Sequence, residues 1–378
     1  MKKTVNLLVL MVLASLSPAF GAQAPGPWEI LARSPGAIEA ATLTTSGQVC
    51  VLEQLRFTRI AAGSVEAQVR ELPMAERIYV SPSGAIQASI TYEGVKDVAN
   101  AAQMTVSRDG KQLWSLEHHA LNDVFPLESG GAVGVNRNIN LPLNSVYFLS
   151  PHGELIKQLE LPAVGEIKTS LSGDRILINS GVEGSLLYSA AGDEIARLGT
   201  AYRMFFSADG RWAAILHGPR ISLYLDGRAA YSGELGGEIV RGVAFSPDHA
   251  LFAAFTDHAL FLMRNPSGEV VMQRQLEAQG EWSFASVDLT KDASCIAIGI
   301  ERDLGSEVKG PDRHPEGEVR LYNRDGSICY QQKVTYTRWN TTTPRVQFSA
   351  DGRQLLVLTR DEVMRAPVES LCGTGGEE

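Results

Sequence analysis

The chain has 378 residues, 44% of them hydrophobic and 20% charged, and its 43 acidic residues outnumber its 34 basic ones to give a net charge of −9. This acidic balance disfavours nucleic acid and anionic membrane surfaces as partners, because both repel a negative protein surface. Length by itself would suggest about two or three domains.

The first two dozen residues have the pattern of a secretory signal. Lys2 and Lys3 form a charged start, Leu7 to Leu16 is apolar but too short for a stable membrane anchor, and Ala19 to Gly21 supplies small residues for cleavage. We therefore predict a signal peptide over residues 1–21, a periplasmic or secreted protein, and no membrane anchor, with an uncleaved anchor as the alternative. Cleavage leaves 32 basic residues against 43 acidic ones.

A short phrase then recurs along the chain. It consists of an apolar residue, Ser or Thr, one variable residue and Asp-Gly or a close relative, followed by an apolar run. The clearest copies are Val80–Gly84 (VSPSG), Phe206–Gly210 (FSADG), Phe245–His249 (FSPDH) and Phe348–Gly352 (FSADG), and weaker copies start at Leu43, Phe125, Ser170 and Leu289. Their mean spacing of about 44 residues is the length of a four-stranded propeller blade.

Each copy predicts a hairpin, because Asp-Gly supplies a turn whose positive φ costs little at glycine. The runs that follow, such as Trp212–Ile215 and Leu251–Phe255, are mostly apolar, as expected for strands covered on both faces. A second strand pair follows at a steady offset, for example Val146–Ser150 and Ile221–Leu225. Each unit therefore contains strands a, b, c and d. Because helical periodicity is absent, we predict an all-β fold.

The two ends of the array complete each other. After the last copy, Gln354 to Thr359 and Glu362 to Pro367 supply strands b and c, but no fourth strand follows. Trp28 to Arg33 precedes the first copy and has no blade of its own. We predict that this N-terminal segment adds the outer strand of the last blade and closes the ring, which protects the sheet edges. The propeller would span residues 28–370, with a flexible tail over 371–378.

Eight copies predict eight blades. Seven is the alternative, if the weak copy at Phe125 or Ser170 is not a true blade.

Two families resemble this repeat. Phe206–Arg211 and Phe348–Arg353 resemble the repeat of periplasmic TolB-type (PD40-like) propellers, and Val243–Asp248 with Val319–Tyr322 resembles WD40 repeats. The sequence has no Trp-Asp dipeptide and no Gly-His pair, so it is WD40-like without the strict signatures. The resemblance implies a β-propeller, a fold commonly used for protein binding, and assigns no catalytic residue.

The four cysteines are Cys50, Cys295, Cys329 and Cys372. Cys295 and Cys329 fall on strands b and d of one blade, about 9 to 10 Å apart, which is too far for a disulfide. Cys372 in the predicted tail could reach Cys50 or Cys329, as an oxidising compartment would allow. The favoured interpretation is small buried thiols and one free tail thiol.

Binding residues are expected in the b–c and d–a connections, because insertions fall there and long connections are more often functional than short ones. The loop from Glu301 to Glu318 is rich in charge, and Thr335 to Pro344 combines Trp and Tyr with Arg, a composition typical of interface hot spots. A solvated loop set without a ligand is the alternative. The candidate contact residues are Arg137, Arg302, Asp312, His314, Tyr336, Arg338 and Trp339.

Metal and catalytic sites are less well supported. His118 and His119 are adjacent on an extended segment and point to opposite sides, so they do not easily share one ion. Asp312, His314 and Glu316 could act as acid and base, but such groups are common in surface loops. We predict no cofactor or metal and a monomeric, non-catalytic scaffold that binds a protein or peptide on the loop-rich face. The alternative is a hydrolase or lyase acting on a small or carbohydrate substrate in the central funnel.

Overall fold

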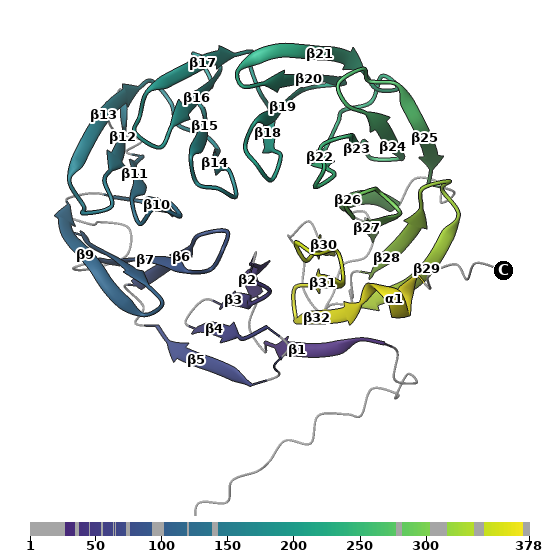
Figure 1. Ribbon diagram of the computed structural model, residues 1–378, viewed down its shortest axis with the longest axis horizontal. Helices are drawn as coiled ribbons and strands as arrows, with labels where there is room; N and C mark the ends of the chain where they lie inside the picture. Colours follow the sequence, from purple (N-terminus) through teal and green to yellow (C-terminus); the bar gives the residue numbers. More distant parts are fainter. Residues whose placement is uncertain are drawn as a thin grey trace, which may run out of the picture.

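The computed structural model describes residues 27–34, 38–44, 46–53, 56–62, 64, 66–72, 76–92, 102–118, 121–137, 143–276, 282–302, 316–335 and 344–372. Within these residues, eight antiparallel sheets of four strands stand around a central axis as the blades of a β-propeller (Figure 1). The predicted signal peptide lies outside this part of the chain. None of the described helices is long and apolar enough to cross a membrane.

Each blade runs from strand a at the axis to strand d at the periphery. Blade 1 contains β2 (Ile38–Leu43), β3 (Val49–Glu53), β4 (Arg56–Ile60) and β5 (Ala67–Glu71). Blade 2 contains β6 (Glu76–Val80), β7 (Ile86–Tyr92), β8 (Ala102–Arg108) and β9 (Lys111–His118). Blade 3 contains β10 (Asp123–Pro126), β11 (Ala132–Asn136), β12 (Asn144–Leu149) and β13 (Leu155–Leu161). Blade 4 contains β14 (Ile167–Thr169), β15 (Arg175–Asn179), β16 (Ser185–Ser189) and β17 (Glu194–Leu198).

The second half of the ring repeats this order. Blade 5 contains β18 (Arg203–Phe206), β19 (Trp212–His217), β20 (Arg220–Leu225) and β21 (Arg228–Glu234). Blade 6 contains β22 (Gly242–Phe245), β23 (Leu251–Phe255), β24 (Ala259–Arg264) and β25 (Val270–Gln275). Blade 7 contains β26 (Trp282–Leu289), β27 (Cys295–Arg302), β28 (Glu316–Asn323) and β29 (Ile328–Thr335). Blade 8 contains β30 (Arg345–Phe348), β31 (Gln354–Leu358), β32 (Glu362–Pro367) and β1 (Glu29–Arg33).

Every copy of the repeated phrase forms the turn between strands a and b of one blade. The two weakest copies, at Phe125 and Ser170, connect β10 to β11 and β14 to β15. Both blades have a full set of four strands, so the eight-blade prediction is confirmed and the seven-blade alternative is wrong.

Hydrogen bonds explain why the phrase has these residues. Ser246 is fully buried; its hydroxyl donates to Asp248 at 2.7 Å and accepts the N–H of Leu251 at 3.0 Å. Asp248 in turn accepts the N–H of Ala250 at 3.1 Å. The turn thus satisfies its own buried polar groups. The hydroxyl and the carboxylate of the phrase are therefore structural.

The glycine of the phrase has two reasons to be glycine. Gly210 has a φ of 71°, which other residues rarely adopt. A Cβ there would lie only 2.5 Å from the Cβ of Ser170, in the corresponding turn of the preceding blade. The phrase therefore also sets how closely neighbouring blades approach.

Hydrophobic packing between blades forms the core. All five residues of β23 are buried. Leu251 and Phe255 from this strand belong to the same hydrophobic cluster as Ile298 and Ile300 of β27 in the next blade. This arrangement accounts for the unbroken apolar runs in the sequence, because strand b is covered on both faces.

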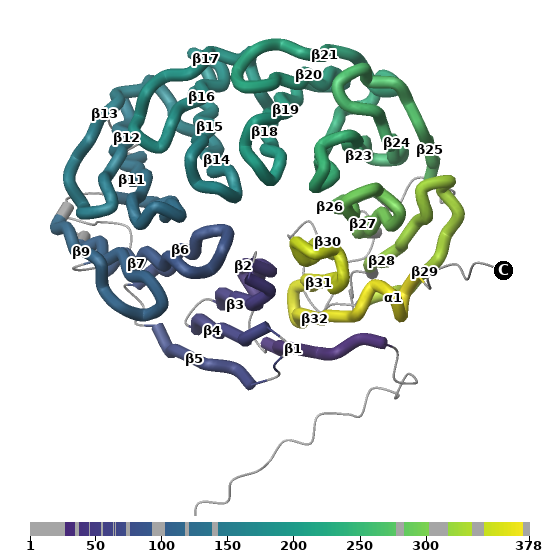
Figure 2. Tube along the Cα trace, viewed as in Figure 1, coloured from purple at the N-terminus to yellow at the C-terminus, as the bar shows by residue number. Residues whose placement is uncertain are grey.

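The ring closes as predicted, with the N-terminal strand completing the last blade. β1 pairs antiparallel with β32, and Figure 2 shows the purple start of the fold beside its yellow end. The Arg365 guanidinium, which is buried, donates to Glu29 Oε2 at 2.6 and 3.0 Å. Next to this strand, Trp28 Nε1 donates to the Tyr330 hydroxyl at 2.7 Å. No sheet among the described strands therefore lacks its outer strand.

The cysteines differ from the favoured prediction. Cys372 forms a disulfide with Cys329, while Cys50 and Cys295 are buried free thiols. A short helix, α1 (Val368–Leu371), causes the difference: it carries the chain back onto blade 7 with Leu371 buried. A helix of four residues has no periodicity to read, so the sequence did not reveal it. Cys372 belongs to the fold, and the predicted tail lies outside the described residues from 373 onward.

Candidate binding surface

The topology gives the ring two different faces. The a–b and c–d turns of every blade meet on one face, and the b–c and d–a connections meet on the other, because successive strands run antiparallel. The first face is built from the short, self-bonded turns of the repeat. The second, which we call the loop-rich face, carries Arg137, which follows β11 in a b–c connection.

Among the seven candidate contact residues, Arg137 has a side chain within the described part of the structure. It follows β11 and forms an ion pair with Asp123 of β10. Its Nε donates to the carbonyl of Val164 at 3.0 Å, and Nη2 donates to that of Gly165 at 2.8 Å. These carbonyls lie on the d–a connection that leads into blade 4, so Arg137 ties two blades together. A contact with a partner there stays a prediction.

The side chains of the other six candidates lie outside the described residues. Arg302 ends β27, and its side chain lies outside the described residues. The remaining five, together with His119 of the weak metal candidate, fall on segments outside the described part of the chain. These are Asp312, His314, Tyr336, Arg338 and Trp339.

A hollow of about 540 Å³ lies where the inner strands of blades 4 to 8 converge. It is within the size range of ligand pockets. Its charged lining, among the described residues, consists of four cations and one carboxylate. These are Lys168, Arg203, Arg241, Arg345 and Glu166.

Lys168 and Arg241 have carboxylate partners. Lys168 lies 2.9 Å from Glu166, and Arg241 donates to both carboxylate oxygens of Asp257, at 2.8 and 2.9 Å. These hydrogen bonds raise the pKa of Arg241. With Asp257 included, the hollow still has an excess of two positive charges among its described residues, in a protein that is negative overall.

The other two cations occupy equivalent places in the repeat. Arg203 and Arg345 each stand three residues before the apolar residue that opens a copy of the phrase, Phe206 and Phe348. Burial, and then the positive charge of Arg203, lower the pKa of Arg345. The Arg203 guanidinium donates to the Arg241 carbonyl at 3.2 Å and lies 5.8 Å from the ring of Tyr202. No carboxylate of the described residues lies within ion-pair distance of Arg203.

These arginines were missed because they form no local motif. The signal that could have found them is positional: arginine stands three residues before the phrase in blades 2, 5 and 8, at Arg77, Arg203 and Arg345. In a ring, equal register means equal height along the axis. Arg77 does not line this hollow; it donates to the carbonyl of Asn122 at 3.2 Å.

Exposed apolar side chains distinguish the faces further. Leu143 and Val182 lie in b–c connections, and Tyr202 and Ile239 in d–a connections. They belong to consecutive blades, 3 to 6, and Val182 is 82% exposed. Among the described turns of the opposite face, Leu171 is the one exposed large apolar side chain. Tyr202 also lines the hollow, so the apolar residues reach its edge.

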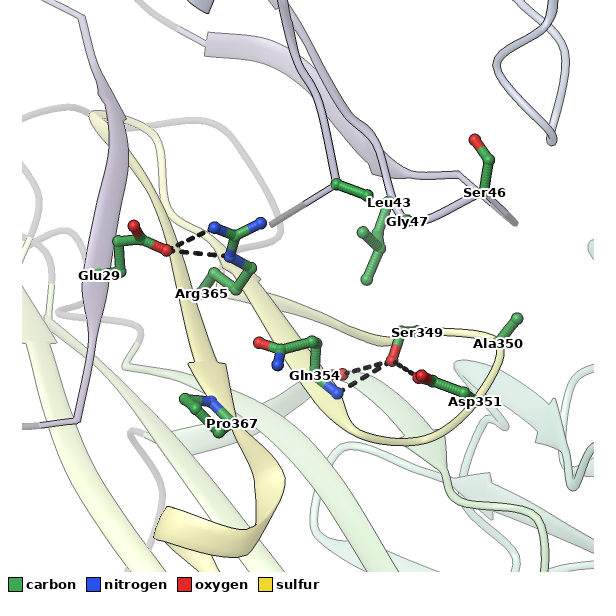
Figure 3. Close-up of a pocket in the computed structure, with 11 residues that line it drawn as sticks. Glu29, Leu43, Ser46, Gly47, Ser349, Ala350, Asp351, Gln354, Arg365 and Pro367 are labelled. Carbon is green, nitrogen blue, oxygen red and sulfur yellow. Dashed lines mark hydrogen bonds and ion pairs between the residues drawn. The ribbon is translucent and has the colours of Figure 1, made fainter. Parts of the chain in front are cut away.

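A second hollow, of about 480 Å³, lies on the opposite face at the closing seam between blades 8 and 1 (Figure 3). Its polar groups bond one another. Glu29 pairs with Arg365, and the Ser349 hydroxyl donates to Asp351 and accepts the N–H of Gln354 at 2.9 Å. This groove is therefore part of how the ring closes, with Glu29 bonded to Arg365 and Ser349 bonded to Asp351.

Comparison with known protein families finds no match, and neither does comparison with curated proteins. Solved structures match over most of the chain. The C-terminal WD40 domain of Sif2 has a TM-score of 0.58 at 11% identity, covering 91% of this chain and 99% of its own. A chain of a mitotic checkpoint complex has a TM-score of 0.51 at 12% identity, covering 93% and 99%. A eukaryotic initiation factor has a TM-score of 0.54 at 9% identity, and the match covers 83% of this chain and 92% of that one.

The chain has a WD40-like β-propeller fold. At these identities the likeness shows the fold alone. The missing Trp-Asp signature agrees with the absence of a family match. The feature that this WD40-like propeller repeats is the Ser-x-Asp-Gly turn, in which the serine and aspartate side chains form hydrogen bonds within the turn.

Proposed function

We propose that this propeller is an exported, non-catalytic scaffold that binds a protein or peptide partner on its loop-rich face. The observation that carries the proposal is the unequal distribution of exposed apolar side chains between the described connections of the two faces; the other exposed ones lie on outer strands. Four exposed apolar side chains, Leu143, Val182, Tyr202 and Ile239, come from loop-rich connections of consecutive blades. Exposed apolar groups on one face are typical of protein-binding surfaces.

Binding is favoured over hydrolysis by the chemistry of the hollow. Glycoside hydrolysis generally needs two carboxylates on either side of the scissile bond. The described lining offers one, Glu166, which is paired with Lys168 at 2.9 Å. A site made of cations and one neutralised acid is suited to holding a ligand.

The partner test compares the two faces. The protein would be immobilised without its first 21 residues, and a partner captured from an extract of the cells that make it. We expect Val182→Glu combined with Ile239→Glu to weaken capture at least about tenfold, because each change places a carboxylate in an apolar contact, where an unpaired charge costs over about 1 kcal/mol. Leu171→Glu, an exposed apolar residue on the opposite face, is the matched control. Equal loss in both variants would contradict the proposal.

The candidate contact residues of the sequence belong to the same proposal. Trp339→Ala with Arg338→Ala is expected to weaken capture while leaving the melting temperature nearly unchanged. Unaltered capture would show that these two residues do not belong to the partner-binding surface.

Export has its own test. The proposed signal peptide requires the mature protein to begin after Gly21 and to be recovered from the periplasm or the medium. N-terminal sequencing of the protein from fractionated cells would decide, and recovery from the cytoplasm with Met1 to Gly21 intact would exclude export.

A further inference from the structure

We propose that the hollow formed by the inner strands of blades 4 to 8 binds the carboxylates of an acidic peptide segment. This inference rests on the proposed function and names the chemistry of the partner. Four cationic residues and one anionic residue among the described ones line the hollow. The rest of the molecule is acidic, so the positive site is set apart from its surroundings.

Arg203 is the central residue of this site. Its guanidinium has a backbone carbonyl and an aromatic ring as neighbours, and no carboxylate of the described chain within ion-pair distance. Guanidinium groups present a planar fork that matches a carboxylate with two parallel hydrogen bonds. An incoming carboxylate would give Arg203 the counter-charge that Arg241 already has in Asp257.

Arg345 adds a second positive charge at the same level. Arg203 and Arg345 occupy the same register position in blades 5 and 8 and both line the hollow. Placing two like charges in one hollow costs free energy in the empty protein. An anion bound at Arg203 reduces that repulsion, so the arrangement favours an occupied site.

The occupant is a peptide segment because of size and surroundings. A hollow of about 540 Å³ is much larger than a single phosphate and suits a ligand of several side chains. Tyr202 lines it and is also one of the exposed apolar residues of the loop-rich face. A peptide segment that spans the hollow and the neighbouring loop-rich face would place its acidic groups over the arginines. Its apolar groups would then lie over the exposed apolar side chains of that face.

Titration calorimetry with defined probes tests this assignment. The probes are a capped hexaglutamate peptide, a capped hexaglutamine peptide and inorganic phosphate, at low and at physiological ionic strength. We expect hexaglutamate to bind one-to-one, more weakly at higher salt, and hexaglutamine not to bind. Arg203→Gln should weaken hexaglutamate binding about tenfold, the effect of one charge-assisted hydrogen bond. Arg203→Glu should abolish it, and Arg203→Lys should retain part of it.

Arg228→Gln is the matched control, because Arg228 is exposed on the outer strand β21 of the same blade. Its binding of hexaglutamate should equal that of the wild type. Hexaglutamate binding that is insensitive to Arg203 would overturn the proposal. Binding of phosphate without binding of hexaglutamate would also overturn it and would indicate a site for a free small anion.

The two proposals fail in different ways. If the Val182 and Ile239 variants lose partner capture while hexaglutamate does not bind, the acidic-segment inference fails and the protein-binding function stands. If hexaglutamate binds through Arg203 while capture is insensitive to the loop-rich face, the protein-binding function fails and the anionic site stands.

Discussion

The Gln347 side chain of β30 bonds both backbone polar groups of Leu43 in β2, across a sequence separation of 304 residues. Its Oε1 accepts the Leu43 N–H at 3.0 Å, and its Nε2 donates to the Leu43 carbonyl at 2.8 Å. One amide thus joins blade 8 to blade 1, in addition to the pairing of β1 with β32.

Gln347→Leu should therefore destabilise the ring. Two hydrogen bonds of this kind contribute about 1–2 kcal/mol together to the free energy of unfolding. Urea unfolding followed by fluorescence measures the change. Gln331→Leu, on the exposed outer strand β29, is the control and should have little effect. An equal loss in both variants would show that the seam contributes nothing specific.

Glu29→Gln should loosen the closing strand. Arg365 is buried and Glu29 is its carboxylate partner, so removing that charge should cost about 1–2 kcal/mol, a figure reduced because Glu29 is partly exposed. The control lies in the same strand pair: Arg33 and Glu362 are 2.8 Å apart with Arg33 largely exposed. Glu362→Gln should cost under about 0.5 kcal/mol. Chemical unfolding of the two variants in parallel tests this ranking.

Asp288 should make stability fall as the pH rises. Burial raises its pKa to about 6, although the N–H groups of Phe348 and Leu289 donate to it. An unfolded Asp titrates near ~3.9, so between about pH 4 and 6 the folded protein binds the proton more tightly. Between about pH 4 and 6 the contribution of Asp288 to the free energy of unfolding declines by at most about 3 kcal/mol. Above about pH 6 this contribution no longer changes with pH.

Comparing the unfolding free energies of wild type and Asp288→Asn across pH isolates this contribution. The wild type should lose stability relative to the variant between about pH 4 and 6. Asp292 is a control of opposite sign, because hydrogen bonds from Ser294 lower its pKa, and its contribution is lost as the pH falls. A pH-independent difference for Asp288→Asn would contradict the assignment.

Reducing the Cys329–Cys372 disulfide should destabilise the protein by about 2–4 kcal/mol, because the bond closes a loop of 43 residues in the unfolded chain. Unfolding with and without reductant measures this, and Cys372→Ser should reproduce the reduced form. Alkylation of the denatured, unreduced protein should label Cys50 and Cys295 alone. Labelling of all four cysteines would show that the bond is absent.

The sequence predicted the fold well because the information that specifies it is local. Each a–b turn is built by residues a few positions apart, as Ser246, Asp248 and Leu251 show, so the turn recurs as a readable phrase. Ring closure could be predicted for a related reason. The last blade lacked a fourth strand, and Trp28 to Arg33 formed a strand without a blade of its own.

The hollow could not be predicted because nothing local specifies it. Arg203, Arg241 and Arg345 lie in three different blades, and only the curvature of the ring brings them around one space. Loop length and composition directed attention to residues such as Trp339 instead. The Cys329–Cys372 disulfide was left as an alternative to a free tail thiol for a similar reason, since a four-residue helix decides where Cys372 lies.

Glu29 and Arg365 are separated by 336 residues and yet hold one blade together. During synthesis β1 emerges first but can pair only after nearly the entire polypeptide has been made. Until then the earlier blades have an open end, and such late, non-local pairing is slow and exposes strand edges. A donor dye near β1 and an acceptor near β32 would therefore report the final event of folding, and chaperones that protect unfinished rings should act before that signal appears.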